Sequence, residues 1–157
     1  MLVLDAGNSL LADRDPAKAT RGVSTIDLMN KMGYNAMTLG TMDLANLAPD
    51  ELQQRIREAQ FPILSANAYI TGTEQLVAQP YVVLPVADHK VGILGLTDAG
   101  STKDVTISDP LLTAQKWVPQ VQKEADIVIV LSHAGLETDQ KIAAQVPGID
   151  VIVSGGN

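Results

Sequence analysis

The chain has 157 residues, a formal net charge of −7 at pH 7, and 46% hydrophobic residues, which is the composition of a soluble globular domain with a core. The acidic balance argues against nucleic acid or an anionic membrane as a partner, because both bind basic surfaces. The absence of cysteine excludes disulfides, thiolate metal sites and a cysteine nucleophile. No apolar run approaches the roughly 20 residues of a membrane span, and the first residues lack the basic region of a signal peptide. These features leave the compartment undecided.

Strand and helix patterns alternate along the first half of the chain. Ser24 is the expected N-cap of a first helix that Gly33 stops, and Pro49 with acidic neighbours begins a second helix. The expected elements are strands at 2–4, 36–39 and 61–65, helices at 24–32 and 49–59, and loops at 10–21 and 67–79.

The second half continues the alternation after a hairpin. The expected elements are hairpin strands at 81–86 and 91–96, helices at 110–124 and 138–146, and strands at 127–131 and 149–153. Pro119 should kink or interrupt its helix, and Thr138 is the expected cap of the last one. The order of elements predicts one α/β domain over 1–157, with a mostly parallel sheet and one antiparallel hairpin.

Polar residues and glycine follow several of the predicted strands, at 5–8, 40–43, 132–135 and 154–157. In an open α/β sheet the ligand crevice lies beyond the carboxyl ends of the strands, so these segments are expected to meet there. The alternative for each segment alone is an ordinary turn, since Gly, Ser, Asn and Asp are common turn residues. Together they indicate a binding edge but define no reaction.

Several stretches match a known family in both residues and spacing, at 4–10, 29–40, 61–67, 91–97, 125–135 and 146–156. They resemble the metallophosphoesterase domain of the 5'-nucleotidase family, a calcineurin-like phosphoesterase. The resemblance implies a two-sheet sandwich with flanking helices, here without the usual first strand and closing segment. Active family members use two divalent metals such as manganese or zinc to cleave phosphate esters. They are usually exported in bacteria and carry a second domain that recognises the nucleotide.

The family's metal-binding and catalytic positions are mostly replaced in this sequence. The family takes ligands from an Asp-x-His motif, a Gly-Asp turn, the Asn of Gly-Asn-His-Glu, a later His, and a Gly-Gly-His-x-His ending. The Asp-x-His motif has no counterpart here. By the resemblance, the bridging Asp falls on Asn8. The Asn, the catalytic His and the Glu of Gly-Asn-His-Glu fall on Thr41, Met42 and Asp43. The first His of the ending falls on Asn157. Only His133 keeps its family identity, so no catalytic residue is assigned.

These replacements predict that the chain binds no metal cofactor. Two divalent cations about 3.5 Å apart repel by about 19 kcal/mol at an effective dielectric of about 20. A bridging carboxylate offsets much of this repulsion, whereas the neutral amide of Asn8 offsets little. Met42 carries a soft thioether, which is a poor partner for a hard metal and cannot donate a proton.

If a rearranged site exists, its candidate ligands are His133, Asn8, Asp43, Asp5 and Asn157, and its expected lining is Thr41, Met42, Ser132, Gly155 and Gly156. The alternative for His133 is a relic whose ring nitrogens bond the backbone. The alternative for Asp5 and Asp43 is turn hydrogen bonding. His89 is expected in a solvated turn, and the methionines at 29, 32, 37 and 42 are expected to line the core or the crevice.

Three functions stay open at this stage. The first is a degenerate domain, a pseudoenzyme kept for binding or assembly. The second is an active phosphoesterase with a rearranged metal site and water as nucleophile. The third is a piece of a larger phosphoesterase. Sheet edges left open by the missing strand predict self-association or a protein partner.

Overall fold

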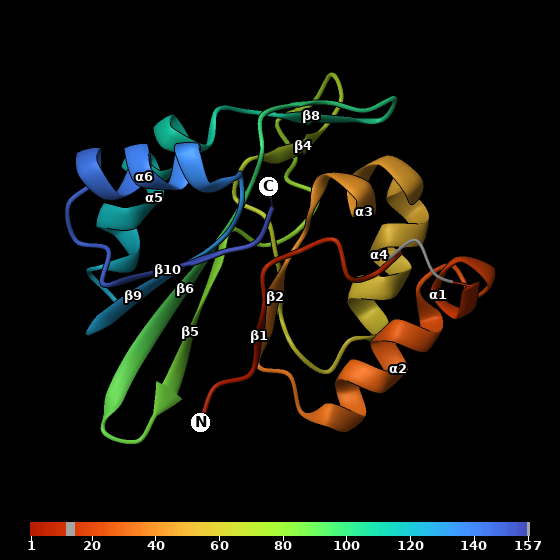
Figure 1. Cartoon of the computed structure of the whole chain (residues 1–157), viewed down its shortest axis with the longest axis horizontal. Coiled ribbons are helices and arrows are strands. Elements are labelled where there is room, and N and C mark those ends of the chain that lie inside the picture. The colour runs from red at the N-terminus through yellow and green to blue at the C-terminus, as the bar shows by residue number, and fades with distance from the viewer. Residues whose placement is uncertain (12–14, 157) are drawn as a thin grey trace.

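Two sheets lie face to face in the middle of the molecule, with helices on the outer side of each (Figure 1). The computed structural model describes residues 1–11 and 15–156. The first sheet has the order β1-β2-β3, and its strands are all parallel. Its members are β1 (Leu4–Asp5), β2 (Ala36–Thr38) and β3 (Ile63–Leu64).

The second sheet has the order β10-β9-β6-β5, and its members are β5 (Tyr81–Val86), β6 (His89–Thr97), β9 (Ile127–His133) and β10 (Val151–Ser154). β9 runs parallel to both of its neighbours, while β5 and β6 form an antiparallel hairpin. A small antiparallel sheet lies above both, with the order β4-β8-β7, made of β4 (Ala68–Ile70), β7 (Gly100–Ser101) and β8 (Val105–Ile107).

The helices are α1 (Asp15–Ala19), α2 (Val23–Met32), α3 (Thr41–Asn46), α4 (Pro49–Glu58), α5 (Pro110–Val121) and α6 (Leu136–Gln145). Gly33 ends α2 in the left-handed conformation, as its sequence predicts. α5 begins where the Asp109 carboxylate accepts a hydrogen bond from the backbone N–H of Leu112, at 2.8 Å. None of the helices in the described ranges has the length and apolar character needed to cross a membrane.

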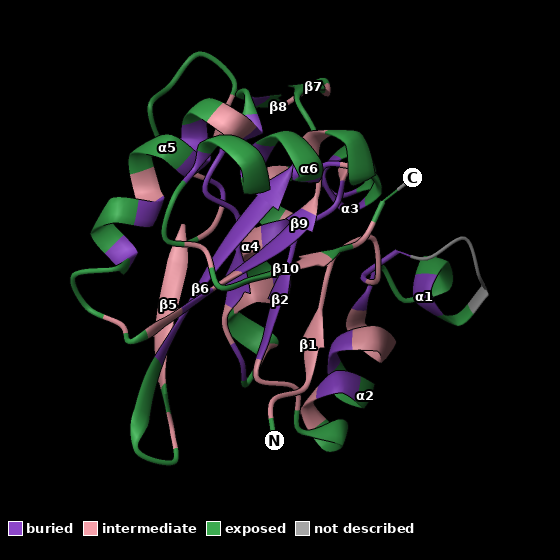
Figure 2. Cartoon of the chain, turned by 60° about the vertical axis from the view of Figure 1, so that its left-hand side comes forward, coloured by how far each residue is buried: buried purple, intermediate pink, exposed green. Residues whose placement is uncertain are grey.

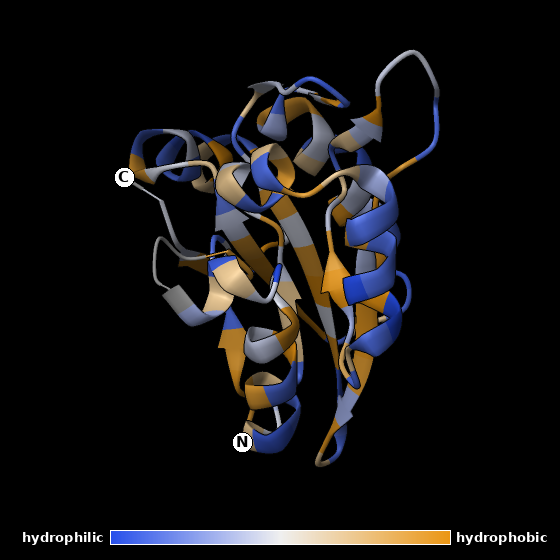
Figure 3. Cartoon of the chain, turned by 90° about the vertical axis from the view of Figure 1, so that its right-hand side faces the viewer, coloured by the Kyte–Doolittle hydropathy of each residue, from blue (hydrophilic) through white to orange (hydrophobic). Residues whose placement is uncertain are grey.

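Apolar side chains fill the three spaces between the four layers. Val91 and Ile93 of β6 face the first sheet, whereas Leu94 and Leu96 face α5 and α6. This alternation buries both faces of β6 from Val91 onward, whereas His89 and Lys90 at its start are exposed (Figure 2). On the other side, Met37 and Ile63 of the first sheet pack with α2 and α4. Hydrophilic residues concentrate on outward helix turns and loops (Figure 3).

The predicted α/β class, the parallel pairings and the hairpin over 81–96 are confirmed, but the antiparallel sheet of β4, β8 and β7 was not predicted, and several elements need correction. Ser24 does not cap α2, because the helix begins at Val23 after Gly22. Thr138 lies inside α6, whose N-cap is Gly135. The expected loops contain α1 and β4, and α3 was not predicted at all. α5 runs through Pro119 without interruption and ends at Val121, three residues before the expected end, so the expected interruption is wrong.

Candidate functional site

A small polar pocket lies where five strands end. It has a volume of about 210 Å³ and is lined by Asn8, Thr41, Asp98, His133, Ala134, Gly135 and Gly156. These residues follow β1, β2, β6, β9 and β10, or end β9 in the case of His133. The polar strand ends therefore meet at one edge, as expected. We call the pocket that they line the strand-end pocket.

His133 lines the strand-end pocket, and one of its ring nitrogens is used in the fold. Its Nδ1 lies 2.7 Å from the backbone oxygen of Ala6. Because a carbonyl oxygen only accepts, Nδ1 is the donor in this contact, and in the neutral form of the ring Nε2 carries the lone pair. One nitrogen thus bonds the backbone, as the relic interpretation expects, while Nε2 could accept a proton or bind a metal.

Asn8, which the sequence resemblance matches to the family's bridging Asp, makes a hydrogen bond within the fold. It adopts a left-handed backbone with φ of 63°, and its Oδ1 accepts a hydrogen bond of 2.8 Å from the N–H of Met42. This bond satisfies a backbone donor in the first turn of α3. The contact is so close that a Cβ on Gly40 would lie 2.1 Å from Asn8 Oδ1, which requires glycine at position 40.

Asp43 is completely buried and does not line the pocket. Its carboxylate accepts hydrogen bonds from the backbone N–H groups of Gly40, Asn8 and Leu10 at 2.9–3.0 Å, and from Leu11 at 3.4 Å. Burial raises the pKa of Asp43 to about 6, against the lowering effect of these bonds. The side chain ties the loop after β1 to the start of α3.

Asp5 makes hydrogen bonds within its turn, which is the alternative to metal binding that the sequence left open. Its Oδ1 accepts from the N–H of Gly7 at 2.9 Å, and its Oδ2 accepts from the hydroxyl of Ser9 at 2.6 Å. Both oxygens therefore serve the turn that leads into the pocket.

Ser132 points away from the strand-end pocket, toward α6. Its hydroxyl and that of Ser154 each donate to the carboxylate of Asp139, a residue that is only 4% exposed. Asp139 was not singled out from the sequence, because an acidic residue in the first turn of a helix is ordinary there. The network joins the ends of β9 and β10 to α6.

The remaining predicted residues are distributed around this edge. Thr41 and Gly156 line the strand-end pocket, Gly155 packs against Ala6, and Met42 is 47% exposed beside a different pocket. Asn157 lies outside the described residues. Met29 and Met37 are core residues as expected, whereas Met32 is exposed, and His89 is exposed beside the hairpin turn.

Asp98 is the pocket residue that sequence reasoning missed. It is exposed at the end of β6, and its backbone N–H donates to the oxygen of His133 at 3.1 Å. The signal was present, because Asp98 and Gly100 follow an apolar strand as the other polar strand ends do. Within residues 1–11 and 15–156, no group of three or more His, Asp or Glu side chains is placed to hold a metal ion.

Relatives with similar sequences carry phosphoesterase names. The chain is 34% identical to human 5'-nucleotidase over 148 residues, which cover 86% of this chain and 25% of that protein. It is 29% identical to the trifunctional nucleotide phosphoesterase protein YfkN of Bacillus subtilis, over 98% of this chain and 13% of that protein. The chain thus spans about a quarter or less of these relatives. No protein-family model matches it.

Solved structures give the same result for the fold. The 5'-nucleotidase precursor from Thermus thermophilus superposes with a TM-score of 0.81 and 32% identity, covering 98% of this chain and 32% of that one. NAD nucleotidase from Haemophilus influenzae has a TM-score of 0.80 and 30% identity, covering 99% of this chain and 29% of that one. By sequence and by fold, the chain belongs to the 5'-nucleotidase family of metallophosphoesterase domains.

Proposed function

We propose that this domain does not hydrolyse phosphate esters, and that its phosphoesterase fold serves binding or assembly. The proposal is carried by Met42, which the sequence resemblance matches to the family's catalytic histidine and which lies in the first turn of α3. A thioether cannot donate a proton to a leaving group, and it offers no charge or N–H to a phosphoryl oxygen.

The donor set of the strand-end pocket supports the same proposal. The family's two divalent metals need a bridging carboxylate, but Asn8 is neutral and its Oδ1 already accepts the N–H of Met42. Asp43 is buried with its carboxylate on backbone N–H groups. Among the residues that the structure describes, His133 Nε2 and the carboxylate of Asp98 remain in this pocket, which is fewer than the three protein ligands of a catalytic metal site. The residues present do not fit the family's metal pair.

A second candidate function is a phosphoesterase with a rearranged ligand set. The observation in its favour is that His133, Asp98 and Asn8 line one pocket, with the Nε2 lone pair of His133 available. A third is a piece of a larger phosphoesterase, which is in keeping with a chain that spans a quarter of the human relative.

Hydrolysis assays separate the first function from the second. We expect no metal-dependent release of phosphate from 4-nitrophenyl phosphate or a nucleoside 5'-monophosphate with manganese or zinc supplied. His133→Ala should behave like the parent chain in this assay, and so should His89→Ala, which removes an exposed turn histidine as a matched control. Turnover that His133→Ala abolishes and His89→Ala retains would contradict the proposal.

The proposed assembly would use the sheet edges. Within the described residues, β1 pairs only with β2, and β10 pairs only with β9. Val151 on the β10 edge is 45% exposed, and Leu2, Leu4 and Val153 are only partly buried at the margin of the cluster between the sheets. Unpaired strand edges with apolar side chains favour the addition of another strand.

A further inference from the structure

A groove lies between the edge strand β10 and helix α6, and we call it the β10 groove. In Figure 2, β10 lies below α6 and is coloured exposed and intermediate. The groove has a volume of about 330 Å³ and is lined by Leu136, Asp139, Gln140, Ala143, Ile149, Asp150, Val151, Ile152 and Ser154. Leu136 is 62% exposed and Val151 is 45% exposed, although both are apolar. Apolar surface therefore adjoins a strand that is paired on one side only.

The free edge of β10 carries backbone groups that another strand could bond. The N–H of Asp150 donates to the backbone oxygen of Val128 at 3.0 Å, so residue 150 turns its backbone groups toward β9. Successive residues of a strand turn these groups to alternate sides, so those of Val151 and Val153 face outward. β10 is four residues long and contains no proline.

The other edges of the two main sheets are less suited to strand addition. β1 is only two residues long. On β5, the oxygen of Pro80 accepts the N–H of Gly95, and the same alternation turns Pro85 to the free edge, where it has no N–H to donate. Beside β3, Gln79 forms a bridge with Leu64. Among the edges that the structure describes in these sheets, β10 alone has more than two residues and no proline.

The β10 groove carries negative charge. Of the described residues that line it, Asp139 and Asp150 are acidic and none is basic. Asp139 is buried and accepts from the hydroxyls of Ser132 and Ser154, while Asp150 accepts the N–H of Val128 at 2.8 Å. These donors are uncharged, so they leave the charge of both carboxylates in place.

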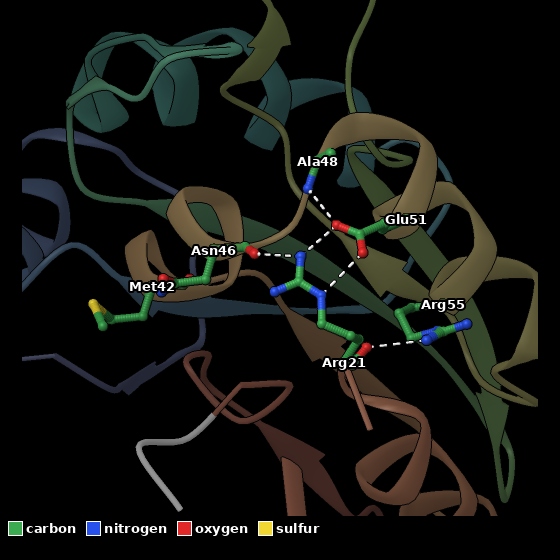
Figure 4. Close-up of polar contacts among 6 residues, drawn as sticks. All are labelled: Arg21, Met42, Asn46, Ala48, Glu51 and Arg55. Carbon is green, nitrogen blue, oxygen red and sulfur yellow. Dashed lines mark hydrogen bonds and ion pairs between the residues drawn. The ribbon is translucent and has the colours of Figure 1, made fainter. Parts of the chain in front are cut away.

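The chain does not supply a cation to this groove. The ion pairs found among the described residues join Arg21 to Glu51 (Figure 4), Arg55 to Glu58, and Lys141 to Glu137. None of these pairs includes Asp139 or Asp150. Because the whole chain has a formal charge of −7 as well, both the local and the overall charge favour a cationic partner.

We propose that β10 binds an extended peptide segment of another protein as an added strand, with a lysine or arginine side chain in the β10 groove. The peptide backbone would pair with Val151 and Val153, and its cation would lie near the carboxylates of Asp139 and Asp150. In this mode of recognition backbone pairing supplies affinity, and the groove supplies selectivity.

This proposal names a partner for the binding role proposed above, and it rests on that role. The two can fail separately, because the β10 groove and the strand-end pocket share no lining residue. Metal-dependent hydrolysis would contradict the proposed loss of activity, whereas the peptide titrations below test only the edge and the groove.

The test titrates the chain with the probe peptide acetyl-Thr-Val-Lys-Val-Thr-amide. A second copy at β10 would compete with the peptide, so the chain is kept at a concentration at which sedimentation shows a monomer. The backbone amide resonances of Val151 and Val153 should shift saturably, while that of Val83 on β5 should not. Unshifted amides on β10 would overturn the proposal.

Two altered peptides separate the backbone contribution from the charge. A peptide with norleucine in place of lysine should bind about fivefold more weakly, the upper range for one exposed ion pair. A peptide N-methylated on its three central amides should not bind, because it lacks the N–H donors that strand addition needs. If either altered peptide binds as tightly as the probe peptide, the proposal is wrong.

The matched protein variants are Asp150→Asn and Asp126→Asn. Both carboxylates are exposed and accept a backbone N–H, from Val128 and Lys90 respectively, which asparagine can also do. Asp150→Asn should weaken the lysine peptide by about threefold and leave the norleucine peptide unchanged. Asp126→Asn, outside the groove, should change neither affinity. Equal weakening by both variants would mean that only the overall charge matters, and it would overturn the proposal.

Discussion

Asp43 connects two strand ends that lie far apart in the sequence. Its buried carboxylate accepts backbone N–H groups from Asn8 and Leu10, after β1, and from Gly40, after β2. This carboxylate serves the backbone rather than the pocket. The shape of the strand-end pocket therefore depends on a side chain that does not line it.

Replacing Asp43 should destabilise the fold. Asp43→Ala leaves buried backbone N–H groups without an acceptor, so we expect the free energy of unfolding to fall by about 2–4 kcal/mol. Urea denaturation at pH 7 measures this change. Asp27→Ala, which removes an exposed acid of α2, is the control and should stay within about 0.5 kcal/mol of the parent chain. Equal stability of the two variants would show that Asp43 does not hold the loops together.

For single residues, the sequence predicted which of them stand at the strand ends, but it did not predict their hydrogen bonds. Asn8, Thr41 and His133 line the strand-end pocket as expected. Asp43 and Ser132 do not, because their polar atoms are taken by backbone N–H groups and by Asp139. Such pairings join residues far apart in sequence, so they follow from tertiary packing and not from local pattern.

The elements that the sequence predicted best are the long aliphatic strands and the helices with strong end signals. β9 and the β5–β6 hairpin follow from continuous apolar runs, and α4 follows from Pro49 and its acidic first turn. The strands β4 and β8, which the sequence did not predict, are short. They pair with each other although they are far apart in the sequence, with Ala68 opposite Ile107. The start of α2 was misplaced because Gly22 stands at the N-cap, while the hydroxyl of Thr20 accepts from the N–H of Ser24.

The link between α4 and the turn before α2 should depend on pH. Arg21 lowers the pKa of Glu51 to about 2 from 4.5, so ionised Glu51 is favoured in the folded state. Its stabilising contribution is therefore present above pH 4.5 and is lost as the pH falls toward 2. We expect Glu51→Gln to melt below the parent chain at pH 7, with the difference disappearing near pH 2. A difference that persists at that acidic pH would rule out the ion pair as its origin.

The main body of the molecule is a four-layer sandwich in which β1 is an edge strand of one sheet and β10 is an edge strand of the other. The sequence predicted the sandwich through its family resemblance, but the separation into two main sheets and a third small sheet follows only from long-range pairing. The open edges make association between copies the expected behaviour of the molecule.

Association through β10 should respond to a charge on its edge. Sedimentation of the parent chain should show association that rises with concentration, and Val151→Lys should reduce it, because a lysine on an edge strand opposes pairing. Leu112→Lys, a similar change at an exposed residue of α5, is the control and should leave association unchanged. A parent chain that stays monomeric at high concentration would contradict this prediction.

The measurement that tests the central claim most directly is the metal content and metal-dependent melting of the purified chain, with manganese or zinc supplied. The account predicts no bound metal and no stoichiometric shift in the melting temperature, because Asn8 and Asp43 are engaged by backbone N–H groups. One or two metals per chain, with a clear rise in the melting temperature that His133→Ala removes, would contradict it.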